Sequence, residues 1–234
     1  MKVGIIGANG FIGSAIYNLL KDKYDQVDGI TRGSYEYYKH NEYDVLINTN
    51  GNSRKFWANN NPKEDFVLSV QSVYNALFDF RFKKYIQISS IDSFESSVYG
   101  NNKSIVEHIL KQYVSVFNLS IIRCPQVIGK NMQKGVVADI LNGKSIFLQP
   151  DSKLNLITNI KVAEIIQMTI SKNLVGNYNI GSTNSVTIKA IAKILGKSLN
   201  LSTELRFENY SNYYVSNTMK PYLKTAEAYL KEII

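Results

Sequence analysis

The sequence predicts an α/β fold in which helices cover both faces of a parallel β-sheet. Two observations predict it. Short apolar runs alternate with helical patterns over the first half of the chain, and three closely spaced glycines follow directly behind the first run. Strands that alternate with helices pair in parallel, because each helix carries the chain back to the same end of the sheet. Ligands of such sheets bind at the carboxyl ends of the strands, so functional residues are expected there.

Five runs in the first half have the pattern of strands, and three segments have the pattern of helices. The expected strands cover residues 2–6, 26–31, 44–48, 84–89 and 119–123, and the expected helices cover residues 13–21, 62–80 and 103–118. Beyond Pro125 the pattern loosens. There we expect a strand near 154–160, a helix over 161–171, a short strand at 177–180 and a helix over 187–195. The segment 202–217, rich in Tyr, Asn and Ser, is assigned to no element.

The glycines Gly7, Gly10 and Gly13 stand at a turn from strand to helix. In this spacing the first glycine allows a tight turn, the second removes a Cβ that would strike a phosphate, and the third lets helix and strand pack closely. The following helix points its N-terminal amides and the positive end of its dipole at the bound anion. The turn therefore predicts a dinucleotide site in a Rossmann-like, doubly wound parallel sheet.

The link between the second and third expected strands is short. No room remains between Thr31 and Asp44 for the helix, strand and helix that a six-stranded dinucleotide fold usually places there. We expect this third, edge strand to be missing or vestigial. Residues 1–125, with strands and a helix returning at about 154–182, are the predicted Rossmann domain. Residues 126–153 and 183–234 are the predicted small C-terminal substrate lobe.

The composition narrows the class of protein. With 44% hydrophobic and 20% charged residues, the chain is expected to be globular. No run reaches the roughly 18 apolar residues of a membrane helix. The glycines interrupt the first apolar run, so neither a membrane span nor a signal peptide is expected. The single cysteine, Cys124, excludes an intramolecular disulfide, and we expect a cytoplasmic protein.

The formal net charge of +8 is spread along the chain. No dense block of Lys and Arg stands out, which disfavours nucleic acid as a partner and suits the attraction of phosphate-bearing small molecules. His40 and His108 stand alone, and no His, Cys and Asp have the spacing of metal ligands. No metal site is expected.

Ser89 and Ser90 end the fourth expected strand, and Tyr99 and Lys103 open the helix after it. Residues four apart share one face of a helix. The lysine ammonium would lower the phenol pKa from about 10 towards neutrality. The tyrosine could then pass a proton to or from an oxygen that a serine holds. The same spacing recurs at two other pairs, Tyr17/Lys21 and Tyr35/Lys39. Only Tyr99 follows a strand that ends in serines; the plain alternative is a surface tyrosine beside a solvated lysine.

Six segments stand in a recognisable order along the chain. They are the glycine spacing 7-10-13, residues 85–90 (Tyr-Ile-Gln-Ile-Ser-Ser), Tyr99-Gly100-x-x-Lys103-x-x-x-Glu107, residues 122–129 (Ile-Arg-Cys-Pro-Gln-Val-Ile-Gly), residues 159–163 and residues 177–182. Over about the first 195 residues the chain thereby resembles the extended short-chain dehydrogenase/reductase family. This NAD(P)-dependent epimerase/dehydratase group acts mostly on nucleotide sugars.

The resemblance implies an oxidoreductase in which Tyr99 is the acid/base, Lys103 tunes it and bonds the nicotinamide ribose, and Ser90 orients the substrate oxygen. Hydride would pass between the nicotinamide and a sugar carbon. The residues expected to bind the cofactor are Gly7, Asn9, Gly10, Phe11, Ile12, Gly13, Thr31, Arg32, Asn50, Gly51, Tyr99, Lys103 and Pro125. Those expected to bind the nucleotide-sugar substrate are Ser90, Asp92 and Gln126.

The chain departs from the family pattern in the segment before Tyr99. Ser90 and Tyr99 are only nine positions apart, where the family inserts a longer loop that contacts substrate. A competing alignment makes Val98-Tyr99-Gly100 the family's Val-Tyr-Gly and leaves no catalytic tyrosine; Lys103 and Glu107 argue against it. Ser69 and Gln126 stand where the family commonly has Asn. Ile91-Asp92 replaces the Asp-Glu of the dehydratases, which disfavours dehydration.

Arg32 follows the second expected strand, where an acidic residue would select NAD. Its guanidinium can pair with a 2′-phosphate, and Thr31 or Ser34 can add hydrogen bonds, so NADP(H) is favoured while NAD(H) stays open. We expect an NADPH-dependent reductase of a nucleotide-linked keto-sugar. The alternatives are a nucleotide-sugar epimerase that retains NAD and a non-catalytic dinucleotide-binding or sensing protein. The resemblance also implies a homodimer, formed through the helix of Tyr99 and Lys103 and the helix over 62–80.

Overall fold

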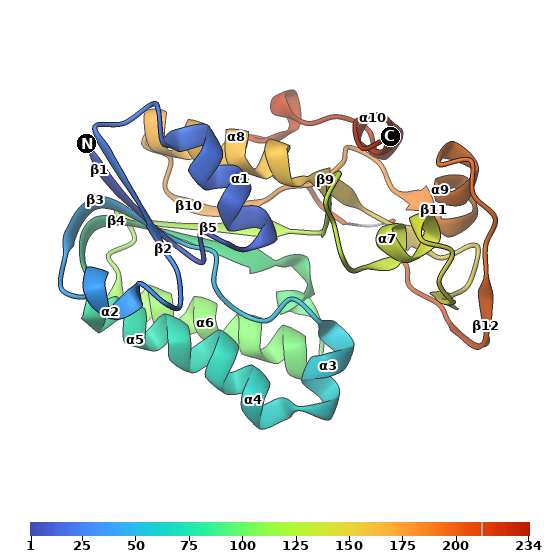
Figure 1. Ribbon diagram of the computed structural model, residues 1–234, viewed down its shortest axis with the longest axis horizontal. Helices are drawn as coiled ribbons and strands as arrows, with labels where there is room; N and C mark the ends of the chain where they lie inside the picture. Colours follow the sequence, from blue (N-terminus) through green and yellow to red (C-terminus); the bar gives the residue numbers. More distant parts are fainter. Residues whose placement is uncertain (212) are drawn as a thin grey trace. The chain divides into compact units, whose positions relative to one another are not determined.

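The computed structural model describes residues 1–211 and 213–234 of the chain. The chain divides into two compact units. Figure 1 shows the chain with its helices and strands labelled and its colours following the residue number. Unit 1 comprises Met1–Cys124 and Val162–Tyr178, and unit 2 comprises Pro125–Lys161 and Asn179–Ile234.

Unit 1 is built on one six-stranded sheet with the strand order β10-β5-β4-β3-β1-β2. Its strands are β1 (Lys2–Ile6), β2 (Gln26–Ile30), β3 (Glu42–Asn48), β4 (Arg81–Ser90), β5 (Leu119–Cys124) and β10 (Gly176–Asn179). The pairings of β1 with β2 and β3, of β3 with β4, and of β4 with β5 are all parallel. Their carboxyl ends therefore meet at the same edge of the sheet, and the expected α/β fold class is confirmed.

Strand β2 is the outermost strand on its side of the sheet, beside β1. Between β2 and β3 the chain forms only the short helix α2 (Tyr35–Tyr38). Strand β3 then joins the sheet on the other side of β1. The expected loss of the third, edge strand is confirmed.

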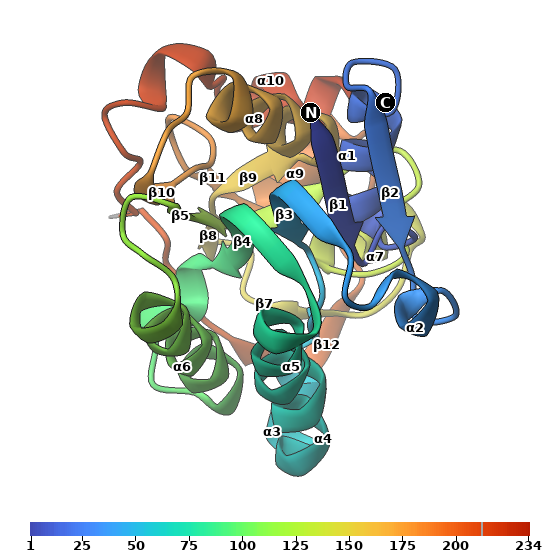
Figure 2. The same cartoon turned by 90° about the vertical axis from the view of Figure 1, so that its left-hand side faces the viewer.

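Helices cover both faces of this sheet, as Figure 2 shows. Helices α1 (Phe11–Leu20) and α8 (Asn159–Ser171) lie on one face. On the other face lie α4 (Pro62–Phe66), α5 (Ser72–Asp79) and α6 (Val98–Tyr113). Tyr43, Tyr85 and Leu110 are fully buried in an apolar core that includes residues of the sheet, α5 and α6. This core sets the position of α6 against β4.

Two expected helices differ in detail from the structure. The helix expected over 62–80 is helical without a break from Pro62 to Asp79, but its middle, Val67–Gln71, is a π-helical turn between α4 and α5. Such turns are frequent at functional sites, because they redirect the side chains that they carry. The helix expected over 103–118 is wrong at both ends, since α6 runs from Val98 to Tyr113. Its early start follows from Ser97, whose Oγ accepts a hydrogen bond from Gly100 N at 3.0 Å and caps the helix.

Among its described residues, unit 2 contains three separate two-stranded ladders. Strand β6 (Gln126–Ile128) pairs with β9 (Leu156–Thr158), and β7 (Ile146–Leu148) pairs with β12 (Leu201–Arg206), both in parallel; β8 (Lys153–Leu154) and β11 (Val186–Thr187) are antiparallel. Its helices are α7 (Val136–Leu141), α9 (Ile188–Ile194) and α10 (Ala226–Lys231). The strand expected near 154–160 is present as β9 but is shorter than expected, because Asn155 separates it from β8 and α8 begins at Asn159. The unassigned segment 202–217 holds most of β12.

Over residues 1–211 and 213–234, no helix has the length and apolarity that crossing a membrane requires. The same residues contain no group of three or more His, Cys, Asp or Glu side chains that could hold a metal ion.

Candidate active site

The glycine turn leads from β1 into α1. Gly7 adopts a φ of +82°, and its N–H and that of Ala8 donate to Ile30 O at 2.9 and 3.3 Å. A Cβ on Gly13 would lie 2.1 Å from Gly7 O, so α1 can pack this closely only with glycine there. A Cβ on Gly10 would meet only Gly7 O, at 3.1 Å. The backbone is therefore open on its outer side, which fits the approach of a pyrophosphate to the start of α1.

The remaining predicted residues of this turn lie at its surface. Asn9 is exposed, and Phe11 and Ile12 are half-buried in the first turn of α1. At the carboxyl end of β2, Thr31 N donates to Ser34 Oγ at 3.0 Å, and Ser34 N donates to Thr31 Oγ1 at 3.3 Å. These bonds close a short turn that leaves Arg32 exposed. Because Ile30 at the end of β2 pairs with Ile6 of β1, Arg32 follows β2 at the same edge of the sheet as the glycine turn.

The segment after β3 joins the glycine turn to α6. Thr49 Oγ1 donates to Ile6 O at 2.8 Å, and Asn50 N donates to Asn48 Oδ1 at 2.9 Å. Gly51 adopts a φ of +129°, and a Cβ there would lie 3.0 Å from Lys103 Nζ. The backbone at Gly51 therefore lies against the lysine side chain of α6.

Ser90, Tyr99 and Lys103 come together at the carboxyl end of β4. Ser90 is the last residue of β4, and its hydroxyl is close enough to Tyr99 to act on the pKa of the phenol. The Lys103 ammonium lies 5.1 Å from the centre of the Tyr99 ring. Tyr99 is 8% and Lys103 9% exposed. In the part of the chain that the structure describes, Lys103 Nζ forms no hydrogen bond, so its N–H groups are free to meet a ligand.

Burial dominates the electrostatics of this cluster. It raises the pKa of Tyr99 above the ordinary phenol value, and the Asp92 carboxylate adds to the rise while the Ser90 hydroxyl opposes it. Burial also lowers the pKa of Lys103 to about 8, against the opposing effect of Asp65 and Asp92. The expectation that the ammonium brings the phenol pKa towards neutrality is therefore wrong for this state of the protein. Tyr99 is protonated at neutral pH and can act as a proton donor.

Ser89, the other serine of the pair, is engaged elsewhere. Its Oγ donates to Glu107 Oε1 at 2.7 Å, and Arg123 Nε donates to the same oxygen at 2.8 Å. Arg123 and Glu107 form a buried ion pair that ties α6 to the ends of β4 and β5. Ser89 is therefore engaged with the ion pair, and Ser90 is the serine of the pair that acts on the pKa of Tyr99.

Sequence reasoning missed the polar groups that support the cluster. Asp65 of α4 is fully buried, and Asn52 and Asn102 both donate hydrogen bonds to its carboxylate. Lys55, which begins α3 (Lys55–Asn60), pairs with Glu95 at 2.6 Å and with Asp92 at 3.6 Å. These residues come from separate loops and helices, so no spacing pattern links them. The one available signal is that Asp65 and Ser69 lie four apart, at helical spacing, in a segment expected to pack against the sheet.

Pro125 and Gln126 belong to unit 2. Gln126 begins β6, and its Nε2 would lie 2.7 Å from a Cβ on Gly135, where φ is +94°. Pro125 Cγ would lie 3.1 Å from a Cβ on Gly181. That Cβ would also meet Asn155 Oδ1 at 2.1 Å, so only glycine fits this position. Both predicted residues are therefore held in close-packed parts of unit 2.

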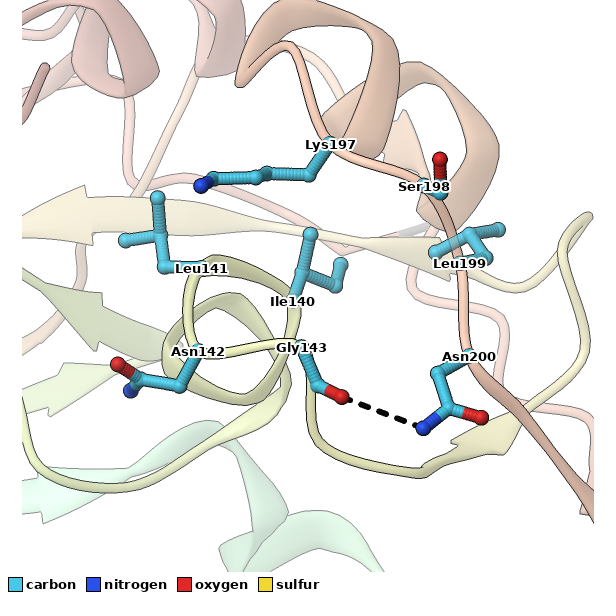
Figure 3. Close-up of a pocket in the computed structure, with 8 residues that line it drawn as sticks. All are labelled: Ile140, Leu141, Asn142, Gly143, Lys197, Ser198, Leu199 and Asn200. Carbon is cyan, nitrogen blue, oxygen red and sulfur yellow. Dashed lines mark hydrogen bonds between the residues drawn. The ribbon is translucent and has the colours of Figure 1, made fainter.

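A pocket of about 510 Å³ lies in unit 2 where α7 and α9 end. Figure 3 shows the residues that line it, which are Ile140, Leu141, Asn142, Gly143, Lys197, Ser198, Leu199 and Asn200. Asn200 Nδ2 donates to Gly143 O at 3.2 Å along one side. The lining includes none of the predicted site residues and a single charged side chain, so the pocket has no part in the site described above.

Comparison with known proteins identifies the fold. No protein-family model matches the chain. The chain is similar to a solved UDP-galactose 4-epimerase, with a TM-score of 0.81 and 16% identity over 100% of this chain and 97% of that one. It is also similar to a dTDP-4-dehydrorhamnose reductase of Bacillus anthracis strain Ames in complex with NADP (TM-score 0.79, 16% identity, 99% and 96% covered). A reductase of the same name from Clostridium acetobutylicum matches with a TM-score of 0.77 and 15% identity, covering 100% and 98%. The expected resemblance is confirmed at the level of the fold.

Proposed function

We propose that this protein is an NADPH-dependent reductase of a keto-sugar carried on a nucleotide diphosphate. The observation that carries the proposal is the cluster of Ser90, Tyr99 and Lys103 at the carboxyl end of β4, with Lys103 Nζ against the backbone of Gly51. Ligands of parallel α/β sheets bind at this end of the strands. The cluster therefore stands where a cofactor and a substrate would meet.

The chain offers a complete set of residues to hold the cofactor. The pyrophosphate would lie on the open backbone of the glycine turn, and the adenosine ribose beside Thr31 and Arg32. When bound, the cofactor supplies the hydride that reduces the carbonyl carbon. The full proposed set is Gly7, Asn9, Gly10, Phe11, Ile12, Gly13, Thr31, Arg32, Asn50, Gly51, Tyr99, Lys103 and Pro125.

Tyr99 is the proposed proton donor to the substrate oxygen. Its proton is held at neutral pH because burial raises the pKa of the phenol. Ser90 Oγ holds the same substrate oxygen, and it is oriented by Asp92, whose backbone N–H donates to it at 3.2 Å. Lys103 is a cation below about pH 8 and stabilises the phenolate that remains after proton transfer.

Arg32 supports NADPH over NADH. It is exposed beside the glycine turn, at the end of the strand where an acidic residue would bind the ribose of NAD. A guanidinium there can form a bidentate pair with a 2′-phosphate.

The charge of unit 2 supports a nucleotide diphosphate as the substrate carrier. Unit 2 holds twelve Lys and Arg residues against six Asp and Glu, so it carries +6 of the net charge of +8. Such an excess attracts anionic ligands. The similar solved structures are named for UDP- and dTDP-linked sugars. Ser90, Asp92 and Gln126 are the proposed substrate-binding residues. The buried free thiol of Cys124 suits the proposed cytoplasmic location.

A nucleotide-sugar 4-epimerase is the second candidate, because a UDP-galactose 4-epimerase shares this fold. An epimerase uses the same cluster in both directions, so Tyr99 would have to accept a proton and then return it. It would also keep its cofactor through the cycle. These two requirements separate it from a reductase in experiments.

The test begins with the nucleotide content of the purified protein. After denaturation, any released dinucleotide is identified, and the protein without nucleotide is titrated with NADPH and NADH. The protein is then assayed with dTDP-4-dehydrorhamnose plus NADPH, and with UDP-galactose alone. The reductase predicts an empty site, tighter binding of NADPH and consumption of NADPH by the keto-sugar. Retained NAD with interconversion of UDP-galactose would establish the epimerase instead. Binding of a dinucleotide without turnover of either sugar nucleotide would leave the non-catalytic alternative, and failure to bind either dinucleotide would overturn the reductase and the epimerase.

We also propose that two copies of the chain associate through α5 and α6. Tyr74 and Phe78 of α5 and Tyr113 of α6 form an exposed aromatic cluster, with ring centres 5.0 to 5.7 Å apart. An exposed apolar cluster of this kind marks a contact surface. Light scattering of the intact protein should give the mass of a dimer, and Phe78→Lys should give the mass of a monomer. Phe207→Lys, which changes an exposed aromatic residue of unit 2, is the matched control.

A further inference from the structure

Asp65 is a fully buried carboxylate that the proposed reaction does not use directly. Its three hydrogen-bond donors are uncharged: Asn52 Nδ2 at 2.8 Å and Ser69 Oγ at 3.3 Å reach Oδ1, and Asn102 Nδ2 at 2.7 Å reaches Oδ2. Within the described residues no Lys, Arg or His lies within salt-bridge distance of it. Burying a carboxylate without a cation beside it costs free energy, even when hydrogen bonds satisfy its oxygens. The position of Asp65 is therefore unusual for a residue that only supports the fold.

The hydrogen bonds of Asp65 join the three segments that surround Lys103. Asn52 follows Gly51 in the chain, and its backbone N–H donates to Ser69 Oγ at 3.1 Å. Asn102 is the residue before Lys103 on α6. Ser69 lies in the π-helical turn between α4 and α5. The carboxylate therefore connects the loop after β3, the π-helical turn and α6.

Lys103 and Ser69 border the same glycine. A Cβ on Gly51 would lie 3.0 Å from Lys103 Nζ and 3.7 Å from Ser69 Oγ. Ser69 Oγ in turn donates to Asp65 Oδ1, so the Asp65 carboxylate is linked through Ser69 to the backbone of Gly51, beside Lys103 Nζ. The Asp65 carboxylate acts on Lys103 through space and favours its charged form. Within the described residues, Lys103 Nζ forms no hydrogen bond of its own.

We propose that Asp65 is a positioning residue for Lys103: its carboxylate keeps the buried lysine charged, and its hydrogen bonds to Asn52 and Asn102 hold the loop at Gly51 against the part of α6 that carries the lysine. The inference rests on the proposed function, because that function gives Lys103 its role. Its test measures the protonation of Lys103 and does not depend on that function. Without the carboxylate, the burial that already lowers the pKa of Lys103 to about 8 would make the side chain neutral near physiological pH. A neutral lysine could not stabilise a phenolate at Tyr99.

Other charged or titratable groups also face this site, and they limit what Asp65 alone can do. Asp92, in the 3-10 turn Ile91–Phe94 after β4, acts on Lys103 in the same direction as Asp65. Tyr99 lies one turn away on α6, and Cys124 of β5 faces Tyr99. Because Asp92 stays in place when Asp65 is changed, only part of the support for the lysine charge is removed.

The test measures the protonation of Lys103 directly. Intact protein is labelled with a trace of acetic anhydride between pH 6 and 10, and the acetylation of Lys103 is followed by mass spectrometry. Only the neutral amine reacts, so the midpoint of the rate reports its protonation. We expect the midpoint to lie near 8 in the unchanged protein and about one pH unit lower in Asp65→Asn. Exposed Lys111 on the same helix is the internal control and should not shift.

Two further variants separate charge from structure. Asn102→Ala removes a hydrogen bond but keeps the carboxylate, so its Lys103 midpoint should stay close to that of the unchanged protein. The exchange of Asp65→Asn together with Asn102→Asp returns a carboxylate to the same hydrogen bond and should restore the midpoint. It also provides the test if Asp65→Asn alone does not fold. A folded Asp65→Asn with an unshifted midpoint, or an exchange variant whose midpoint stays low, would overturn the proposal.

Binding of NADPH provides a second readout that activity does not enter. Its affinity, measured by fluorescence titration at pH 7.5, should fall in Asp65→Asn and return in the exchange variant. If no form of the protein binds NADPH while the Lys103 midpoints shift as expected, the proposed function fails and the role of Asp65 stands. If NADPH binds all forms alike and the midpoints coincide, the role of Asp65 fails and the proposed function stands.

Discussion

In unit 1 the last seven residues of β4 are buried, between β3 and β5 of one continuous sheet. In unit 2, by contrast, β12 pairs with β7 alone among the described strands, and none of its six residues is buried. A strand that is buried on both faces has one register, because a slip of one residue would turn every side chain to the other face. Ser90 at the end of β4 is therefore held at a set place. The exposed strand β12 of unit 2 lacks this constraint on its register.

Unit 2 depends on side chains that bond the backbone. Asn155 Nδ2 donates to Ser182 O at 2.8 Å, and Ser182 N donates back to Asn155 Oδ1 at 2.8 Å. Asn184 Oδ1 in turn accepts from Ala226 N at 2.9 Å and ties α10 to the same group. Under the proposed function, the sheet of unit 1 would hold the reacting groups, and unit 2, with its excess of positive charge, would bind the substrate. The predictions below test that division.

The largest effect is expected from Tyr99→Phe. If the chemistry lies in unit 1, removing the phenolic proton should lower kcat by about 1000-fold, while NADPH affinity changes only a few-fold. Steady-state rates and a fluorescence titration measure the two quantities. Tyr17→Phe is the matched control, because Tyr17 also has a lysine four residues later but lies on α1. Retained turnover in Tyr99→Phe would remove this cluster from the mechanism.

A second test of unit 1 is Gly13→Ala. The new Cβ would lie 2.1 Å from Gly7 O, so α1 or the turn must shift. We expect the free energy of unfolding to fall by about 3 kcal/mol, with loss of NADPH binding. In the control Gly33→Ala, the nearest atom to the new Cβ is Thr31 Oγ1 at 4.0 Å. Thermal unfolding and NADPH titration compare the two. Normal binding by Gly13→Ala would show that the glycine turn does not hold the cofactor.

The same contrast explains how much of the fold the sequence predicts. Strand β1 is predicted to the residue, and β2 to β5 within a few residues, because buried parallel strands are apolar runs bounded by turns. The two-residue strands β8 and β11 and the exposed strand β12 have no such run. Their pairing depends on contacts between distant segments. For that reason the sequence predicts unit 1 well and unit 2 poorly.

The candidate site divides in a similar way. Ser90, Tyr99 and Lys103 could be predicted because their positions follow from a strand end and a helix start. Asp65 could not, since its partners Asn52 and Asn102 come from a loop and from another helix. The predicted downward shift of the Tyr99 pKa is also wrong, because the shift depends mainly on burial, which residue spacing does not reveal. Residue spacing predicts which side chains of one helix or strand lie close together. Their pKa values depend on the tertiary packing around them.

A smaller effect, confined to one end of the cofactor site, is expected from Arg32→Ala. Losing a charged hydrogen-bond pair should weaken NADPH by about 1.5 to 3 kcal/mol and leave NADH nearly unchanged. The affinities of both dinucleotides are measured by the same titration. Lys21→Ala, which removes an exposed positive charge at the far end of α1, is the control. Equal losses for NADPH and NADH would contradict the assignment of Arg32 to the 2′-phosphate.

The smallest effect is expected in unit 2, from Asn155→Ala. The change leaves Ser182 N and Ser182 O without their partner, which should cost about 1 to 2 kcal/mol. Amide hydrogen exchange shows where that loss is felt. If the two units are stabilised separately, protection should fall in β9, α10 and the segment around Ser182, while β1, β3 and β4 keep theirs. Asn217→Ala, at an exposed position of unit 2, is the control and should change neither region. Equal loss of protection in the sheet would mean that the units unfold as one, and the sheet would then not hold the reacting groups independently of unit 2.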